Sequence, residues 1–418
     1  MNGMTIIVVP TERCNFKCSG CFEPQSIHDG VGIEYSYEAM AKSLKEVWGG
    51  SYHGSDVCLH GGEPLLTPLV ELEKLMKLIY TLPWEDNKVK GAVSIVTNGS
   101  LITDKHIHLF KKYNVNVALS CDGPPETNIH RGPDPQNKEV TTKYNEQMKK
   151  LIKKLRDNKI NLSIMCILHP NNAGTTEKMK ELGKWMLWLK SLGVTNGRMN
   201  AMYSDKHPEL ELTNKQLHRA WINIYNWNKK HGLRWSPGTD MERNLLHDKG
   251  NKKYFSPTPC TAAKCDPFNT HTISVLPDGT IGNCDRTFAH GIYTRSLDTS
   301  HCGRYEALRQ TECRGCKYWE ICGGGCPEEG IGGDWRSKTR FCEATYKTLE
   351  YIEKKLVEAG KTPNYMTETE ERPLSNSPHG DGPHGDNPHG DSGHGDASHG
   401  NIPHGDSSHG DDADWLRT

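Results

Sequence analysis

Short apolar runs alternate with longer amphipathic segments along the first half of the chain. The apolar runs predict strands at Thr5–Val9, Asp56–His60, Ala92–Val96, Asn116–Ser120, Asn161–Leu168 and Gly197–Met202. The segments between them have helical periodicity, at Tyr37–Trp48, Leu69–Leu82, Thr103–Tyr113, Thr141–Asn158 and Glu177–Leu192. This alternation is typical of parallel βα units rather than of hairpins. It predicts an α/β fold with a partial (β/α)6 barrel over residues 1–235.

Glycine-rich or polar segments directly follow several of these predicted strands. They are Thr11–Phe22, Gly61–Pro64, Thr97–Gly99 and Ser120–Pro124. Parallel strands carry their functional loops at their carboxyl ends, which meet at one edge of the sheet. We therefore expect these segments to form one shared site.

The first of these segments carries three cysteines, Cys14, Cys18 and Cys21, with the spacing C-x3-C-x2-C. Three thiolates can each bind one iron of a 4Fe–4S cube and leave the fourth iron open to a chelating substrate. An open metal site indicates chemistry rather than scaffolding. The alternative is a structural zinc knuckle, but His28 lies too far beyond Cys21 for the usual ligand spacings.

This cysteine spacing resembles the signature of the radical S-adenosylmethionine (radical SAM) superfamily, whose members bind S-adenosylmethionine at the open iron. The resemblance implies a TIM-like partial barrel in which Gly61, Gly62, Glu63 and Pro64 bind the amino group of the methionine moiety. Glycine suits this place because it lets the backbone approach a ligand closely.

The same resemblance implies that Asn98 and Ser120 contact the methionine carboxylate or the ribose. A turn or a strand-end cap is an equal alternative for both residues. Many family members carry an aromatic residue before the third cysteine, where this chain has Gly20. Phe16 and Phe22 are the candidates that would shield the site in its place.

The segment Asp122–Arg131 resembles the loop after the fourth strand in members that modify peptides. Arg131 has two interpretations: it faces an acidic substrate, or it is a solvated surface arginine, which is the default for this residue type.

A second group of cysteines occurs in the segment 260–342. Its members are Cys260, Cys265, Cys284, Cys302, Cys313, Cys316, Cys322, Cys326 and Cys342. Their order resembles the SPASM extension of peptide-maturing radical SAM enzymes, which holds two auxiliary 4Fe–4S clusters. This resemblance implies that one cluster is bound by Cys260, Cys265, Cys284 and Cys326. It implies that the other is bound by Cys313, Cys316, Cys322 and Cys342. Three 4Fe–4S clusters are then expected in all, Cys302 is spare, and structural zinc stays the alternative.

The second predicted domain, residues 236–360, begins its cysteine-rich part with a hairpin pattern. His271–Leu276, the turn at Pro277–Gly279 and Thr280–Cys284 predict a small β element that presents ligands. In sulfatase-maturing relatives an aspartate at the place of Asp285 acts as a base, which makes Asp285 a catalytic candidate. An exposed aspartate without a function is the equal alternative.

The remaining thiols, Cys58, Cys121 and Cys166, lie in or beside predicted strands of the barrel. They are interpreted as small buried hydrophobic residues.

Composition narrows the class of partner. The 418 residues carry 51 basic and 52 acidic side chains, a formal charge of -1, which gives no electrostatic reason to expect nucleic acid or a membrane surface as a partner. The amino terminus lacks the long apolar core of a signal peptide, and no stretch approaches membrane-spanning length. The 15 cysteines therefore indicate a reducing cytoplasm, where clustered thiols hold metal or act in redox chemistry. A flavodoxin or ferredoxin is the expected electron donor.

Residues 361–418 are rich in Pro, Gly, Ser, Asp and His, a composition that predicts disorder. Within 378–411 a His-Gly pair recurs with a five-residue period, at His379, His384, His389, His394, His399, His404 and His409. One interpretation is metal capture by imidazoles and carboxylates. The other is a fused peptide substrate. One branch of peptide maturases joins an aromatic ring to the β-carbon two residues later, and His-Gly-Asp fits that template.

We therefore expect a cytoplasmic radical SAM maturase that modifies a ribosomal peptide, with His–Asp crosslinks in its own tail as the leading hypothesis. A thioether product is excluded for the tail because residues 361–418 contain no cysteine. One alternative is a sulfatase-type maturase that acts on a separate protein and uses the tail to bind metal. The other alternative is a non-catalytic iron–sulfur electron carrier.

Overall fold

The computed structural model describes residues 4–21, 32, 34–49, 54–82, 84, 93–204, 207–246, 272–287 and 303–363. Its contacts divide the chain into two units, Met1–Thr369 and Glu370–Thr418, and the description below concerns the first. The predicted ligands Cys260 and Cys265, the spare Cys302 and the repeats at 378–411 lie outside the described residues.

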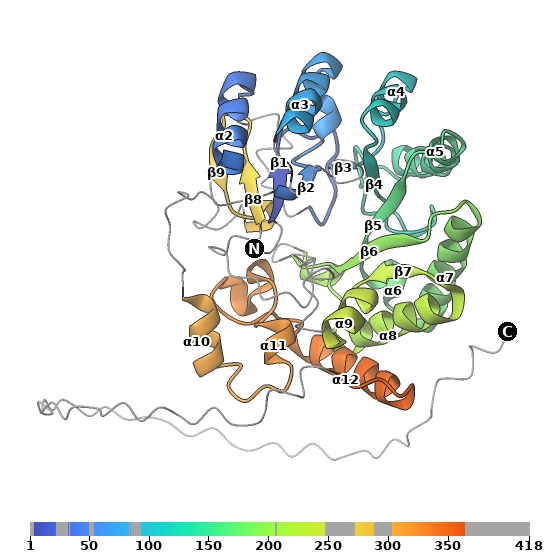
Figure 1. The fold of residues 1–418 in the computed structure, drawn as a ribbon. Coiled ribbons are helices and arrows are strands. Elements are labelled where there is room, and N and C mark those ends of the chain that lie inside the picture. Colours follow the sequence, from blue (N-terminus) through green and yellow to red (C-terminus); the bar gives the residue numbers. More distant parts are fainter. Residues whose placement is uncertain are drawn as a thin grey trace, which may run out of the picture. The chain divides into compact units, whose positions relative to one another are not determined.

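The first unit is built on a nine-stranded sheet with the strand order β7-β6-β5-β4-β3-β2-β1-β8-β9 (Figure 1). The strands are β1 (Met4–Val8), β2 (Gly54–Leu59), β3 (Val93–Thr97), β4 (Asn116–Ser120), β5 (Leu162–Leu168), β6 (Asn196–Ala201), β7 (Arg234–Ser236), β8 (Thr272–Val275) and β9 (Ile281–Gly282). Every pair from β7 to β8 is parallel, and only β8 and β9 are antiparallel. The predicted parallel strands are therefore confirmed.

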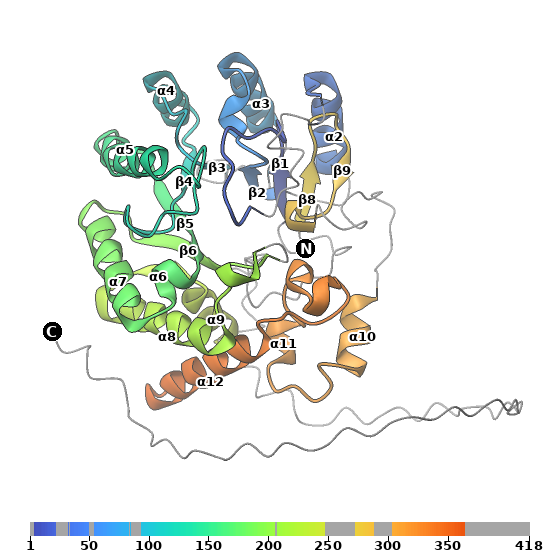
Figure 2. The same cartoon turned by 180° about the vertical axis from the view of Figure 1, so that it is seen from behind.

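Helices cover the outer side of this sheet, as both views show (Figures 1 and 2). They are α2 (Tyr37–Gly49), α3 (Leu69–Thr81), α4 (Asp104–Lys112), α5 (Lys138–Asp157), α7 (Thr176–Ser191) and α8 (Asn214–His231). Burial alternates along β5, with Leu162, Ile164, Cys166 and Leu168 buried and the residues between them half-buried. The contact between the rings of Trp185 on α7 and Trp235 on β7, with centroids 6.1 Å apart, marks the helix-covered face. The half-buried residues therefore line the opposite, concave face.

The predicted hairpin at 271–284 is confirmed over its described part, and it also joins the main sheet. β8 pairs in parallel with β1, so that Ile7 lies beside Ser274. The turn between β8 and β9 fits against α2, because Ser43 Oγ donates to the Gly279 carbonyl at 2.6 Å. Gly279 has φ 83°, and a Cβ there would lie 2.6 Å from the Ala39 carbonyl oxygen, so only glycine fits this turn.

Short helices and one long helix complete the unit. They are α6 (Pro170–Ala173), α9 (Gly238–Leu245), α10 (Arg304–Gln310), α11 (Trp319–Cys322) and α12 (Cys342–Glu358). Helix α12 packs on α8 and α9, and α11 also contacts α9. The Tyr318 hydroxyl donates to Glu353, which ties the cysteine-rich segment to α12. Within the described part of the chain, no helix is long and apolar enough to cross a membrane.

Candidate functional site

The loop after β1 carries Cys14, Cys18 and Cys21 and is fixed from two sides by its backbone. On one side Gly62 N donates to Thr11 O at 3.2 Å, and Glu63 N donates to Arg13 O at 2.8 Å. On the other side Lys17 N and Ser19 N each donate at 3.0 Å, to the carbonyls of Gly132 and His130. We call residues 11–21 the cluster loop. These backbone contacts attach the cluster loop to the segments that follow β2 and β4.

None of the three cysteines of the cluster loop forms a disulfide; Cys14 and Cys18 are half-buried and Cys21 is exposed. Phe16 N donates to Cys14 Sγ at 3.4 Å. Burial raises the pKa of Cys18, and the Arg131 guanidinium and the Gly132 amide act in the opposite direction. Three soft sulfur donors on one loop fit the ligand set of an iron–sulfur cluster. In the described ranges, no group of three His, Cys, Asp or Glu side chains is placed to hold a single metal ion.

The side chain that packs against Gly20 comes from a distant strand end. A Cβ at Gly20 would lie 2.3 Å from Met202 Sδ, just beyond β6, and Met202 is buried. Phe16, expected to shield the site, is instead only 1% exposed and packs edge-on against Tyr144, with ring centroids 4.8 Å apart. Phe22 lies outside the described residues. The apolar neighbour of Gly20 is therefore Met202, which sequence spacing could not indicate.

The two glycines after β2 stand against the backbone of the cluster loop. Gly61 has φ 122°, and a Cβ there would lie 2.4 Å from the Thr11 carbonyl oxygen. A Cβ at Gly62 would lie 2.3 Å from the carbonyl oxygens of Glu12 and Arg13. Glycine is therefore needed at both positions because two backbone segments approach each other closely here. The contact of these glycines with S-adenosylmethionine stays a prediction.

Glu63 joins the ends of β2 and β3. Its side chain is 1% exposed; Oε1 accepts hydrogen bonds from Thr97 Oγ1 at 2.7 Å and Leu65 N at 3.1 Å, and Oε2 accepts one from Asn98 N at 2.7 Å. Burial raises the pKa of this carboxyl, and the same three hydrogen bonds oppose the rise. Pro64 begins the short helix η1 (Pro64–Leu66) directly after it. With both oxygens occupied, Glu63 acts here as a brace.

Asn98 extends this brace to the cluster loop. Its Nδ2 donates to Asn15 Oδ1 at 2.9 Å, and its Oδ1 accepts from Ser100 N at 2.9 Å and from Ser100 Oγ at 2.7 Å. Ser120 ends β4 and is half-buried, and its hydroxyl makes no hydrogen bond with the described residues. The structure therefore places Asn98 against the segment between Cys14 and Cys18, whereas Ser120 keeps its hydroxyl available for a ligand.

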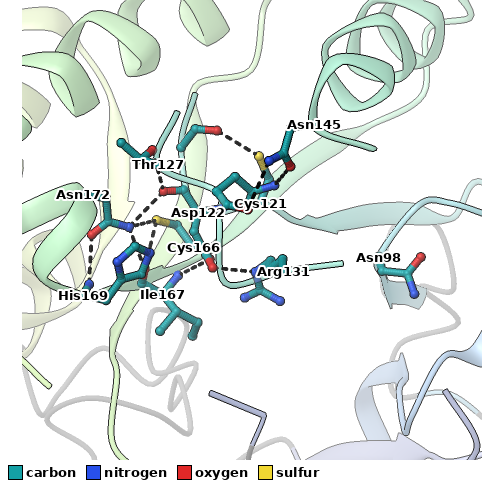
Figure 3. A network of polar contacts seen from close by, with 12 residues as sticks. Asn98, Cys121, Asp122, Thr127, Arg131, Asn145, Cys166, Ile167, His169 and Asn172 are labelled. Carbon is teal, nitrogen blue, oxygen red and sulfur yellow. Dashed lines mark hydrogen bonds and ion pairs between the residues drawn. The ribbon is translucent and has the colours of Figure 1, made fainter. Parts of the chain in front are cut away.

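Arg131 is not a solvated surface arginine, so that default interpretation was wrong. Its side chain is 17% exposed, and its Nε lies 2.8 Å from Oδ2 of Asp122, which is 2% exposed. The other carboxylate oxygen of Asp122 accepts a hydrogen bond from Ile167 N at 2.7 Å. Figure 3 shows the guanidinium of Arg131 beside Asp122, on the side toward Asn98. The ion pair fixes the strand end from which residues 130–132 reach the cluster loop.

A polar network that sequence reasoning missed lies behind this ion pair (Figure 3). Asn172 Nδ2 donates to the carbonyls of Asp122 at 2.9 Å and Ile167 at 2.8 Å, and its Oδ1 accepts from His169 N at 2.9 Å. His169 is fully buried, and burial lowers its pKa to about 4. Its ring contacts that of His130 with centroids 4.7 Å apart. The only signal in the sequence was the position of these residues after β4 and β5.

The predicted ligands Cys313, Cys316, Cys322 and Cys342 all lie among the described residues, and their binding of a cluster stays a prediction. Burial raises the pKa of Cys313 to about 11 and that of Cys322 to about 12, and the neighbouring thiols of the set add to both shifts. The four thiols therefore lie within electrostatic range of one another.

The other predicted cysteine positions are described only in part. Of the set with Cys260 and Cys265, Cys284 and Cys326 are described; both are half-buried, and neither forms a disulfide. Asp285 begins a short helix, η5 (Asp285–Thr287), and its side chain lies outside the described part. The thiols interpreted as small buried residues are confirmed at Cys121 and Cys166, whereas Cys58 is half-buried.

Comparison with known proteins agrees with this geometry. Residues 8–183 match the model of the radical SAM superfamily. The cysteine-type anaerobic sulfatase-maturating enzyme of Clostridium perfringens (strain 13 / Type A) is 24% identical over 348 residues, which cover 78% of this chain and 89% of that protein.

Solved structures share the fold. The structure of anSMEcpe with bound AdoMet and the Cp18Cys peptide matches with a TM-score of 0.63 at 20% identity, over 85% of this chain and 98% of that chain. Streptococcus suis SuiB bound to the precursor peptide SuiA matches with a TM-score of 0.54 at 15% identity, over 82% and 76% of the two chains. The chain therefore carries a radical SAM domain and is homologous to the anaerobic sulfatase-maturating enzymes, and it shares its fold with SuiB.

Proposed function

We propose that the chain is a radical SAM maturase of a peptide or protein, and that its substrate is its own His-Gly-Asp repeat segment, residues 378–411. The observation that carries the first part is the cluster loop. Its three cysteines stand beyond the carboxyl end of a parallel strand, β1, in a loop held by the backbone of residues 61–63 and 130–132. Relatives of the chain act on protein substrates, which supports a substrate of the same class.

The residues of the site have distinct tasks in this proposal. Cys14, Cys18 and Cys21 would hold a 4Fe–4S cluster, which would supply the electron that cleaves S-adenosylmethionine to methionine and a 5′-deoxyadenosyl radical. Gly61–Pro64, Asn98 and Ser120 would bind and orient S-adenosylmethionine. Glu63 and Asn98 support the proposal because they link the ends of β2 and β3 to the cluster loop. Two auxiliary 4Fe–4S clusters, a flavodoxin or ferredoxin donor and a cytoplasmic location complete the proposal.

The repeat itself suits a three-residue crosslink. In an extended peptide, residues i and i+2 face the same side about 6.6 Å apart, so the His and Asp of His-Gly-Asp are neighbours. Glycine between them permits tight closure. A connector from about residue 360 to 378 would span roughly 23 Å if it behaved as a flexible coil, which would give a millimolar-order effective concentration. Weak intrinsic affinity for the repeat is then sufficient.

The chemistry balances with one electron in and one electron out. Hydrogen abstraction from the aspartate β-carbon yields 5′-deoxyadenosine and a carbon radical, and addition of this radical to the imidazole forms a carbon–carbon bond. Loss of one electron, for which an auxiliary cluster would be the acceptor, and of one proton to a base would restore the ring. Asp285 is the candidate base. Each crosslink removes two hydrogens from the peptide.

A sulfatase-type maturase is the second candidate, and the similarity to the Clostridium perfringens enzyme favours it. In that case the substrate is a separate protein and the tail binds metal. The non-catalytic electron carrier lacks such support, because the relatives are enzymes.

Mass spectrometry of the tail after anaerobic turnover separates the two candidates. We expect a loss of about 2 Da per reacted repeat, mapping to His–Asp pairs that face together in an extended chain. His379→Ala should block the first repeat alone by removing the ring, and Asp381→Gly should block it by removing the acceptor carbon. An unmodified tail in a protein that consumes S-adenosylmethionine on a separate sulfatase peptide would establish the second candidate instead.

A further inference from the structure

A cavity of about 450 Å³ lies on the concave face of the sheet, over the amino-terminal halves of β5 and β6. It is lined by residues of β5, β6, β7 and α9, among them Ser163, Arg198, Arg234, Ser236, Asp240 and Arg243. Ser163, Arg198, Arg234 and Ser236 lie on the face opposite to Trp235, which contacts α7. The cavity is therefore separate from the cluster loop, which lies at the other ends of the strands.

The lining has an excess of positive charge. Asp240 is buried and already paired, since it accepts from Ser236 Oγ at 2.5 Å and binds Arg243. Arg198 is half-buried and Arg234 is exposed, and neither guanidinium has an acidic partner among the described residues. Three arginines against one carboxylate leave a surplus of two positive charges at the cavity.

Guanidinium groups select anions with paired oxygens, above all carboxylates and phosphates. The substrate proposed for this chain supplies carboxylates at regular intervals. Residues 373–416 contain eight aspartates, at Asp381, Asp386, Asp391, Asp396, Asp406, Asp411, Asp412 and Asp414, and no lysine or arginine. A repeat peptide therefore complements the cavity in charge.

The geometry also matches the repeat length. Arg198 precedes Met202 by four residues along β6, which is about 13 Å at 3.3 Å per residue. Met202 packs on Gly20 of the cluster loop and so marks the reactive end of the barrel. One five-residue repeat spans about 16 Å when extended. If Arg198 binds the aspartate carboxylate of one repeat, the next repeat of the same extended peptide is long enough to reach the cluster loop.

We propose that Arg198 and Arg234 form a carboxylate-binding subsite for an aspartate of an acidic peptide, one repeat away from the residue that reacts. This inference rests on the proposed function, because it assigns a register to the same peptide substrate. Arg243 supports the subsite by holding Asp240 away from the two free guanidinium groups.

The test measures peptide binding without turnover. The protein is the reconstituted full-length chain with the eight tail aspartates replaced by asparagine, which keeps the tail from competing. The probe is a fluorescent synthetic peptide with the sequence of residues 378–391, followed by anisotropy. The double variant Arg198→Gln/Arg234→Gln should raise the Kd about tenfold, the usual cost of losing a charge-assisted pair. Arg309→Gln, which changes an exposed arginine on α10, is the matched control and should bind as the parent does.

A charge-retaining variant and a probe without carboxylates test whether charge causes the change in Kd. Arg234→Lys retains the charge and should raise the Kd less than Arg234→Gln, and thermal melting should show that both variants are folded. A probe with asparagine in place of aspartate should bind weakly and equally to the parent and to the double variant.

Equal binding of the acidic probe to the parent and to the double variant would overturn the subsite, and so would an absence of binding to the parent. Failure of the proposed function is a different result: an unmodified tail after turnover, measured by mass, whatever the Kd.

Discussion

The two cysteine-bearing regions of the molecule are held in place by different means. The cluster loop takes its shape from backbone hydrogen bonds to residues 61–63 and 130–132. In the segment 313–342, by contrast, thiols are part of the packing: Cys313 belongs to a small core with Leu308 and Trp319, and Cys316 packs against it. We therefore expect the thiols of the first region to be replaceable without loss of the fold, whereas Cys313 and Cys316 of the second region also contribute to packing.

The polar side chains that hold the two regions also differ. Behind the cluster loop, Asp122, Arg131, His169 and Asn172 form a network within the barrel. In the cysteine-rich region a buried arginine, Arg304, donates to the carbonyls of Trp335 at 2.7 Å and Ser337 at 2.8 Å and so binds the loop that precedes α12. Metal binding is coupled to folding wherever ligands are part of a small core. We therefore expect metal loss to stop chemistry in the first region and to loosen structure in the second.

The largest effect is expected from replacing Cys14, Cys18 and Cys21 together with alanine. Reductive cleavage of S-adenosylmethionine should be abolished, while the auxiliary iron stays bound and the melting temperature changes little. Iron content should fall from about twelve to about eight per chain, by the ligand arithmetic of cubic clusters. Iron assay, 5′-deoxyadenosine detection and thermal melting measure the three outcomes. Normal 5′-deoxyadenosine formation by this variant would refute the assignment of the cluster loop.

The matching change in the second region is Cys322→Ala or Cys313→Ala. Each should lower iron content and peptide turnover, and each should also lower the temperature of unfolding, because the thiol is both a ligand and a packed side chain. Limited proteolysis should then cut within 303–342 before it cuts the barrel. Cys121→Ala, at a buried thiol that belongs to neither predicted ligand set, is the control and should leave the iron content unchanged. Stoichiometric zinc in the anaerobic wild-type protein would contradict the auxiliary-cluster assignment.

Acid should loosen the barrel network rather than the cysteine-rich region. Burial lowers the pKa of His169 from its ordinary value of 6.5 to about 4; Asp122 opposes this shift, and His130 and Arg131 add to it. Between these two pKa values the unfolded chain binds more protons at His169 than the folded chain does. The stability that the fold gains from a neutral His169 is therefore complete above pH 6.5 and is lost as the pH falls toward 4. The expected loss is about 3 kcal/mol in the free energy of unfolding. Urea unfolding at several pH values measures it.

His169→Gln should remove most of this pH dependence while lowering stability at pH 7. A wild-type slope that persists in the variant would assign the acid sensitivity to another group.

Features of the fold and the site could be predicted from the sequence where the interacting residues lie close together along the chain. The strands β1 to β6 and the position of the cluster loop followed from local periodicity and spacing, which residues close in sequence determine. The pairing of β8 with β1 joins residues far apart in the chain, and no local pattern encodes it. Arg131 was misjudged for the same reason, since its burial depends on where Asp122 is held by Ile167 of the next strand. Type and place of the elements were predictable, whereas contacts between strand ends were not.

The contact of Gly20 with Met202 offers the finest test of how the cluster loop is held, and the smallest effect. A Cβ at residue 20 would lie 2.3 Å from Met202 Sδ, which no real contact allows, but the obstacle is a flexible side chain that can move. Gly20→Ala should therefore cost about 1 to 2 kcal/mol of stability, within the range for overpacking, and should slow cleavage of S-adenosylmethionine severalfold. Met202→Ala alone should cost stability by leaving a cavity.

The double variant Gly20→Ala/Met202→Ala should be more stable than the sum of the two single changes predicts, because each change relieves the defect of the other. Chemical denaturation of the four proteins gives the interaction energy, and Ala41→Gly on α2 with Met202→Ala is the unrelated pair that should add. If the first pair also added, the cluster loop would not be held by Met202, and its position would depend on its backbone hydrogen bonds and on the contacts of Asn15 and Phe16. The sign of one interaction energy thus decides whether the loop that carries Cys14, Cys18 and Cys21 is supported from the end of β6 as well as from its two backbone neighbours.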